Sequence, residues 1–368
     1  MIRRAIRALP ALEAQPRLPQ TNPAQSAGGE SNVTSIMPTR RALVLGALAA
    51  PAIIGTARAA PVRMRLSSSQ ANDPKYANGR VFNDNLQKRI TEAGLGDQIT
   101  LQFFPDNQLG QEIDIINQVK LGVIDMMVSG TSISANLVPL VGLLDLGYLF
   151  DSFPQQTKAL DAGAARPIEE ALLKGAGIHL IGWAYNFGAR SVLAKRPVHT
   201  PEDLAGMKIR TLPNPIITEC LRLMGAAATP LAFGEIYTAL QAGVLDGLEH
   251  DPPTILASKF FETAKSYALT QHIFSPLVTY FSDATYRRLD PKLRESFLAA
   301  AKLAAGDTRV HGLAVEKEAL DVLKASGVSV IEVDQAAFRK RVLPQTDAFI
   351  KRLPEAKGPI ELIQGTKA

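Results

Sequence analysis

The sequence predicts an α/β fold, and three observations support this. Short apolar or alternating stretches, typical of strands, take turns with stretches of helical periodicity along the chain. A helical pattern of roughly 35 residues begins at Asp290-Pro291 and runs to about Ser326. The 368 residues, of which 46% are hydrophobic, suffice for one large domain or two of ordinary size.

The first half of the chain begins with a strand over Val62–Leu66, where apolar residues alternate with arginines. The polar residues that follow it, through Gln70, are typical of a strand end. The further elements expected are a helix over 76–93, a strand over 98–104, a helix over 111–121, a strand over 124–128, a helix over 154–174 and a strand over 179–187 that leads into Arg190.

The second half is predicted to be mostly helical, with short strands between the helices. Asp290 and Pro291 are expected as N-cap and first residue of the long helix. Asp246 to Pro253 is expected to form a tight acidic turn. The other elements are a helical turn over 201–204, a strand ending at Arg210, helices over 215–224 and 233–242, a crossover through 277–281, a strand over 328–333 and a helix over 335–353.

The N-terminus has the features of a targeting sequence. Arg40-Arg41 precedes a short apolar run, and Ala57-Arg58-Ala59 offers a cleavage site, so 37–59 is predicted to be a signal peptide. The paired arginines resemble a Tat signal, but Leu43 stands at the usual Phe position, so Sec export stays open. Residues 1–36 are rich in Pro, Gln, Ala and Ser, which predicts a disordered upstream extension.

The charge of the chain gives no sign of a nucleic-acid partner. Of 40 basic and 35 acidic residues, residues 1–59 hold seven arginines and two glutamates, so the rest carries 33 of each. A near-neutral body does not predict nucleic-acid binding. The single Cys220 lies in a helical pattern, where a buried thiol is expected.

Residues 206–249 carry an ordered run of motifs. Gly206-Met-Lys-Ile-Arg210 is followed by Pro230-Leu-Ala-Phe233-Gly-Glu235-Ile-Tyr237-Thr-Ala-Leu-Gln-Ala-Gly243 and then by Asp246-Gly-Leu-Glu249. This run resembles the DctP-type solute-binding proteins of tripartite ATP-independent periplasmic (TRAP) transporters. A single G-x-K-x-R would be a weak signal, whereas the whole run in order is specific. The resemblance extends from about Val62 to the C-terminus.

The resemblance implies a two-domain periplasmic-binding-protein-like fold with a cleft between the domains and a long C-terminal bracing helix. The domains are expected to interleave, with 60–187 plus about 276–320 in domain I and 188–275 plus about 321–368 in domain II. It also implies an extracytoplasmic receptor that binds a small organic acid and delivers it to a TRAP-type membrane transporter. The mature protein is expected in the periplasm, as a monomer.

Arg210 is the main candidate for holding the ligand. Its planar, permanently charged guanidinium matches a carboxylate in bidentate fashion. A strand leads into it, and open α/β sheets bind ligands beside strand ends. In the family, the position matching Arg190 also lines the site, although Arg190 could instead pair with an acid of its own domain.

Further candidates are polar or aromatic groups near strand ends. His250 stands where many family members have an asparagine that hydrogen-bonds the ligand, which leaves the identity of the acid open. Phe233 is expected to pack behind the site or in the core, and Trp183 and Tyr185 could form an aromatic wall or belong to the core. The other candidate ligand-binding residues are Ser68, Ser69, Gln70, Thr131, Asn186 and Glu249.

The sequence favours a receptor over an enzyme. It contains no G-x-G-x-x-G after a strand, no P-loop, no G-x-S-x-G, no CxxC and no H-E-x-x-H. The five histidines show no metal-ligand spacing, and we expect neither a metal nor a cofactor. Two alternatives stay open: a secreted α/β enzyme acting on carboxylates, and a ligand-sensing subunit of a signalling system.

Overall fold

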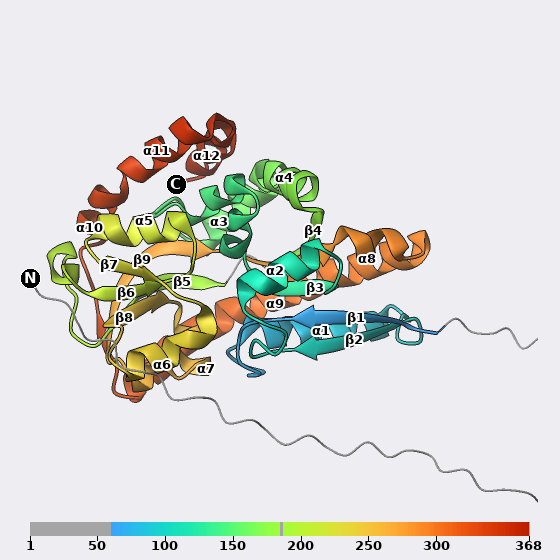
Figure 1. Cartoon of the computed structure of the whole chain (residues 1–368), viewed down its shortest axis with the longest axis horizontal. Coiled ribbons are helices and arrows are strands. Elements are labelled where there is room, and N and C mark those ends of the chain that lie inside the picture. The colour runs from blue at the N-terminus through green and yellow to red at the C-terminus, as the bar shows by residue number, and fades with distance from the viewer. Residues whose placement is uncertain (1–59, 185–186, 368) are drawn as a thin grey trace, which may run out of the picture. The chain divides into compact units, whose positions relative to one another are not determined.

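A computed structural model describes residues 60–184 and 187–367, and these contain two separate β-sheets (Figure 1). The first sheet has the order β2-β1-β3-β10-β4. Strands β1 and β2 are parallel, as are β1 and β3, whereas β10 runs antiparallel to both of its neighbours. The bounds are β1 Val62–Ser67, β2 Ile99–Phe104, β3 Met126–Gly130, β4 Ile178–Trp183 and β10 Leu277–Ser282.

The second sheet has the order β11-β9-β5-β8-β6-β7. Its members are β5 Gly188–Ala194, β6 Lys208–Thr211, β7 Ala227–Pro230, β8 Gly247–His250, β9 Ser266–Ser275 and β11 Ser329–Ile331. Strand β5 lies in the middle of the sheet, antiparallel to both β8 and β9. Arg190 and His250 are therefore carried by neighbouring strands.

Three sequence predictions about these strands are wrong. The acidic stretch from Asp246 was expected as a turn, but Gly247–His250 is the buried strand β8. The strand expected over 179–187 ends at Trp183, and Arg190 belongs to β5 of the other sheet. The expected crossover 277–281 is strand β10.

The chain passes between the sheets at two places that lie side by side. One crossing joins β4 to β5, and the other joins β9 to β10 through Pro276. The amide of Phe187 donates to the carbonyl of Ser275 at 3.0 Å, and the amide of Ala184 donates to that of Leu277 at 2.9 Å. The two crossings thus form a short hydrogen-bonded pair between the sheets.

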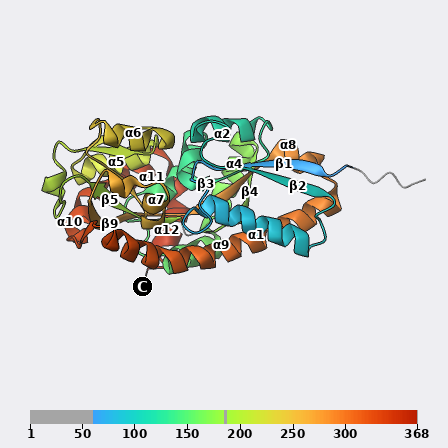
Figure 2. The same ribbon diagram turned by 90° about the horizontal axis from the view of Figure 1, so that it is seen from below.

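The long helix predicted from Asp290 is confirmed as α9, Pro291–Ala325, with 35 residues. The Asp290 side chain accepts hydrogen bonds from the amides of Lys292 and Leu293, which caps the helix. Helix α9 contacts α1 (Asn78–Glu92) and β4 at one end and α7 (Pro252–Ala257) toward the other. Figure 2 shows α9 running along elements of both sheets, which confirms the expected brace.

Other helices flank the sheets, and two predicted helices are interrupted. The helix expected over 154–174 is broken at Gly163, whose φ of 120° is incompatible with a helix. The helix expected over 335–353 is divided before Pro344, which has no amide hydrogen to donate. The remaining bounds are α2 Glu112–Lys120, α3 Phe153–Ala159, α4 Arg166–Ala176, α5 Pro215–Met224, α6 Ile236–Gln241, α8 Asp283–Arg288, α10 Gln335–Val342, α11 Pro344–Arg352 and α12 Lys357–Gln364.

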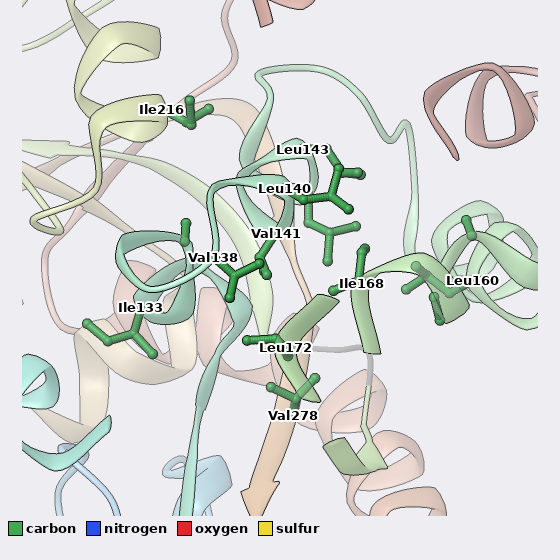
Figure 3. Close-up of a cluster of buried hydrophobic side chains, with 14 of the residues drawn as sticks. Ile133, Val138, Leu140, Val141, Leu143, Leu160, Ile168, Leu172, Ile216 and Val278 are labelled. Atoms are coloured by element: carbon green, nitrogen blue, oxygen red, sulfur yellow. The ribbon is translucent and has the colours of Figure 1, made fainter. Parts of the chain in front are cut away.

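One core cluster joins elements from around both sheets. Figure 3 shows Ile216 of α5 near side chains of two 3₁₀ segments, Thr131–Asn136 and Pro139–Asp145. Leu172 of α4 and Val278 of β10 belong to the same cluster. The predicted domain boundaries stay a prediction. Helix α12, expected in domain II, lies against α3, which was expected in domain I, whereas α10 lies against α5 and β9, which were expected in domain II.

Candidate functional site

A cavity lies where strand ends of the first sheet meet β5 and β8 of the second. Its empty volume, including the solvent at its mouth, is about 340 Å³, which is at the lower end for small-molecule sites. Only a minor part of this space is wide enough for a water molecule. The lining residues are Ser69, Gln70, Glu112, Ser129, Gly130, Ser132, Ile133, Phe187, Arg190, Leu212, Phe233 and His250.

Arg210 is a buried cation whose charged head has free donors. The side chain is 0% exposed, and its Nε donates to the carbonyl of Leu231 at 2.9 Å. Its Nη1 and Nη2 have no hydrogen-bond partner among the described residues. Burial lowers the pKa of Arg210 to about 10, and no carboxylate of the described residues forms an ion pair with it. Unsatisfied buried donors are costly, so these two indicate a missing acceptor.

Phe233 connects Arg210 to the cavity. Its ring lines the cavity, and the Arg210 guanidinium carbon lies 5.9 Å from the ring centroid. Phe233 belongs to the 3₁₀ turn Phe233–Glu235, which follows β7. Phe233 therefore forms part of the cavity wall and has the guanidinium beside it, whereas Trp183 is not among the lining residues.

Arg190 has a protein partner, as one of the sequence alternatives proposed. Its Nε pairs with Oε2 of Glu249, and its Nη2 donates to Oε1 at 2.7 Å and to the Glu249 carbonyl at 3.0 Å. Burial would raise the pKa of Glu249, but the charge and hydrogen bonds of Arg190, together with His272, outweigh burial and hold that pKa well below its usual range. Arg190 still lines the cavity, and its Nη1 takes no part in these bonds.

His272 completes this buried group. Its Nε2 lies 3.6 Å from Oε2 of Glu249, and its Nδ1 lies 2.9 Å from the Thr270 hydroxyl. Burial lowers the pKa of His272, which favours the neutral ring at neutral pH. The sequence analysis did not identify His272, because β9 was not predicted.

His250 lies between two aromatic rings that also line the cavity. The Phe187 and Phe233 centroids are 5.7 and 5.9 Å from the imidazole centroid, both in edge-on geometry. Its Nδ1 contacts Oδ1 of Asp251, whose other oxygen caps α7 through the amide of Thr254. Burial, followed by the charge of Arg190, lowers the pKa of His250, so the ring is neutral at neutral pH.

Glu112, the first residue of α2, is a carboxylate in the cavity wall that the sequence analysis missed. Its Oε1 accepts hydrogen bonds from the hydroxyls of Ser69 at 3.0 Å and Ser129 at 2.9 Å. Gln70, beside Ser69, accepts from the amide of Gly79 at 2.8 Å and reaches Thr254 at 3.4 Å. Glu112 lies well beyond the end of β2 at Phe104, so no strand end marked it in the sequence.

Three of the remaining candidates, Ser68, Thr131 and Trp183, are not among the lining residues. Ser68 is buried and accepts from the amide of Gln70 as a loop cap. Trp183 bonds Glu169 through its indole nitrogen at 2.6 Å, and Thr131 is fully buried. Asn186 lies outside the described residues.

The serines of the lining bond carboxylates. Among the lining residues, Ser69 and Ser129 bond Glu112 and Ser132 bonds Asp145, so no serine is bonded to a histidine. No group of three or more His, Cys, Asp or Glu that could hold a metal occurs in the described part of the chain. Within those residues, no helix has the length and apolar character to cross a bilayer.

Comparisons with known proteins agree on one family. The family model for bacterial extracellular solute-binding protein, family 7 (DctP), matches residues 68–352. The 2,3-diketo-L-gulonate-binding periplasmic protein YiaO of Escherichia coli K12 is 33% identical over 297 residues, covering 80% of this chain and 88% of that protein.

Solved structures are similar over nearly their whole length. A TRAP periplasmic solute-binding protein from Sulfitobacter sp. NAS-14.1, with bound β-D-galacturonate, has a TM-score of 0.78 and 30% identity, covering 83% of this chain and 100% of that one. A protein of the same kind from Polaromonas sp. JS666, bound to D-erythronate, has a TM-score of 0.78 and 30% identity, covering 83% and 99%.

Proposed function

Because this chain belongs to the DctP family of bacterial extracellular solute-binding proteins, we propose that it captures a hydroxylated organic acid and delivers it to a TRAP-type membrane transporter. The assignment of an organic acid as ligand rests on the two free donors, Nη1 and Nη2, of buried Arg210. A carboxylate is the acceptor that fits two parallel guanidinium N–H groups. We propose the periplasm as its location, after export by the predicted signal peptide, which lies outside the described residues.

The groups that line the cavity favour a ligand rich in hydroxyls. Glu112 can accept a hydrogen bond from a ligand hydroxyl, and the serines and Gln70 can both donate and accept. Neighbouring proteins bind β-D-galacturonate and D-erythronate, which combine one carboxylate with several hydroxyls. We therefore propose a sugar acid as the ligand.

A thermal-shift panel tests this function. We expect a sugar acid such as D-galacturonate or D-erythronate to stabilise the protein, while D-galactose and erythritol, which lack the carboxylate, do not. At a ligand concentration of 100 Kd the stabilisation should be about 2.7 kcal/mol. Equal stabilisation by an acid and its uncharged counterpart would contradict a carboxylate site.

Glu112 is expected to exclude a second carboxylate. A ligand anion near this acid would meet repulsion, whereas a ligand hydroxyl would donate to it. Glu112→Gln should reduce the preference for a sugar acid over a dicarboxylate of similar length by about tenfold, measured as a ratio of Kd values by calorimetry. Asp114→Asn, on the exposed side of the same helix, is the matched control and should leave the ratio unchanged.

His250 is expected to limit the size of the ligand. Its ring fills space between Phe187 and Phe233, and asparagine in its place is shorter. In His250→Asn, affinity for a six-carbon acid should rise relative to a four-carbon acid by about tenfold, within the ~1–3 kcal/mol range of a pocket of changed size. His199→Asn, at an exposed position, serves as control. An unchanged ranking of acids would show that His250 does not select among them.

A further inference from the structure

A second cavity lies on the face of β5 opposite the candidate ligand cavity, which is lined by Arg190 and His250 and is called the acid site below. Ala189 and Ser191 line it, whereas Arg190 between them lines the acid site, as expected for alternating side chains on a strand. The C-terminal half of α9 forms the opposite wall. Counted with the solvent at its mouth, the empty volume is about 640 Å³.

Glu316 of α9 brings an uncompensated carboxylate to this cavity. Among the described residues, its one hydrogen bond is accepted from the amide of Ala189 at 2.9 Å. Lys317 also lines the cavity but forms no ion pair with Glu316 within the part of the chain that the structure describes. Burial raises the pKa of Glu316 to about 7, and the charge of Asp251 adds to this effect. A carboxylate held in this way is stabilised by any cation that reaches it.

The wall also contains the polar residues Ser191, Tyr267, Gln271 and Lys317, but its apolar part decides the kind of cation. Leu269, Leu313 and Leu320 lie around the cavity, and Leu313 is 48% exposed although it is a large apolar side chain. A calcium ion requires six to eight oxygen ligands. No cluster of three or more acidic, His or Cys side chains occurs in the described ranges to supply them. An alkyl chain that carries a positively charged head matches both parts of the wall. The head suits the Glu316 carboxylate, and the chain suits the leucines.

We propose that this cavity binds a short-chain aliphatic ammonium ion, with its charged head on Glu316 and its chain against the three leucines. The head would donate to the carboxylate oxygen that does not accept from Ala189. Because Ala189 precedes Arg190, the occupant would contact the same strand that forms a wall of the acid site.

A methyl NMR titration of the ligand-free protein with n-butylammonium chloride tests this site. We expect saturable shifts of the Leu269, Leu313 and Leu320 methyl signals, with Kd on the order of millimolar for a ligand of about five non-hydrogen atoms. n-Butanol, which has nearly the same shape without the charge, should bind at least about fivefold more weakly, since only its chain is recognised.

Glu316→Gln should weaken n-butylammonium binding at least about fivefold and leave n-butanol binding unchanged, because the amide oxygen still accepts from Ala189. Glu318→Gln is the matched control, since this glutamate lies on the same helix, is exposed and pairs with Lys75. Should Glu316→Gln fail to fold, Leu313→Gln at the exposed rim replaces it and should weaken both compounds. Wild-type affinity in the variant that folds, or shifts confined to other methyl groups, would overturn the proposal.

Discussion

Arg210→Ala is expected to weaken binding of the organic acid by roughly 30-fold to several thousand-fold. The guanidinium is fully buried, and two of its nitrogens await an acceptor, so the ligand carboxylate would form a desolvated ion pair with it. Removing one partner of such a pair costs about 2–5 kcal/mol, at tenfold in affinity for each 1.4 kcal/mol. Calorimetric titration with the tightest acid of the panel measures the loss.

Two further substitutions separate charge from geometry. Arg210→Lys keeps the charge but loses the planar fork, so it should recover only part of the affinity. Arg210→Met removes a cation whose pKa falls from 12.5 to about 10 on folding. A lowered pKa means that the folded state disfavours the charged form at every pH below about 10, at a cost of about 3 kcal/mol.

The ligand-free Arg210→Met protein should therefore be at least as stable as the wild type while it fails to bind. This combination of lost function and retained stability is expected of a residue kept for binding. Wild-type affinity in either Arg210→Ala or Arg210→Met would show that the acid binds elsewhere.

Glu249→Gln is expected to lower the free energy of unfolding by about 3–5 kcal/mol, because it leaves buried Arg190 without its counter-charge. The pKa of Glu249 is depressed in the folded protein, so its ionised form contributes stability above the unfolded value near 4.5. In the wild type that contribution is lost progressively as the pH falls below this value, and the variant should lack this part of the acid dependence.

Urea denaturation of Glu249→Gln can be followed by the fluorescence of Trp183, the single tryptophan of the chain. Glu219→Gln is the control, since Glu219 pairs with Arg222 on the surface, where such a pair contributes less than about 1 kcal/mol. Equal stability of Glu249→Gln and wild type at neutral pH would contradict a stabilising role for the buried pair.

The parts of the fold with strong local signals were predictable from the sequence. The long helix carries its own cap at Asp290 and Pro291, and α5 begins at Pro215 as expected. Strand β8 was not predicted, because it is short and lies between two turn signals, Asp246-Gly247 and Pro252-Pro253. Strand β9 carries polar residues such as Thr270 and His272, which are buried only through contacts with distant parts of the chain.

The candidate site was predictable where a motif or a strand end marked it. Arg190, His250, Phe233, Ser69 and Gln70 line the cavity, and Arg210 lies against Phe233; their role in binding stays a prediction.

Glu112 and Phe187 could not be assigned in this way. Their positions in the wall depend on how the second sheet meets the first, and a single sequence does not reveal such a contact.

A crystal structure with the tightest-binding acid of the panel tests the central claim most directly. We expect both carboxylate oxygens to lie about 2.7–3.1 Å from Nη1 and Nη2 of Arg210, with ligand hydroxyls toward Glu112 and Ser69. An acid bound elsewhere, with those two nitrogens still unpartnered, would contradict the assignment of this cavity as the receptor site.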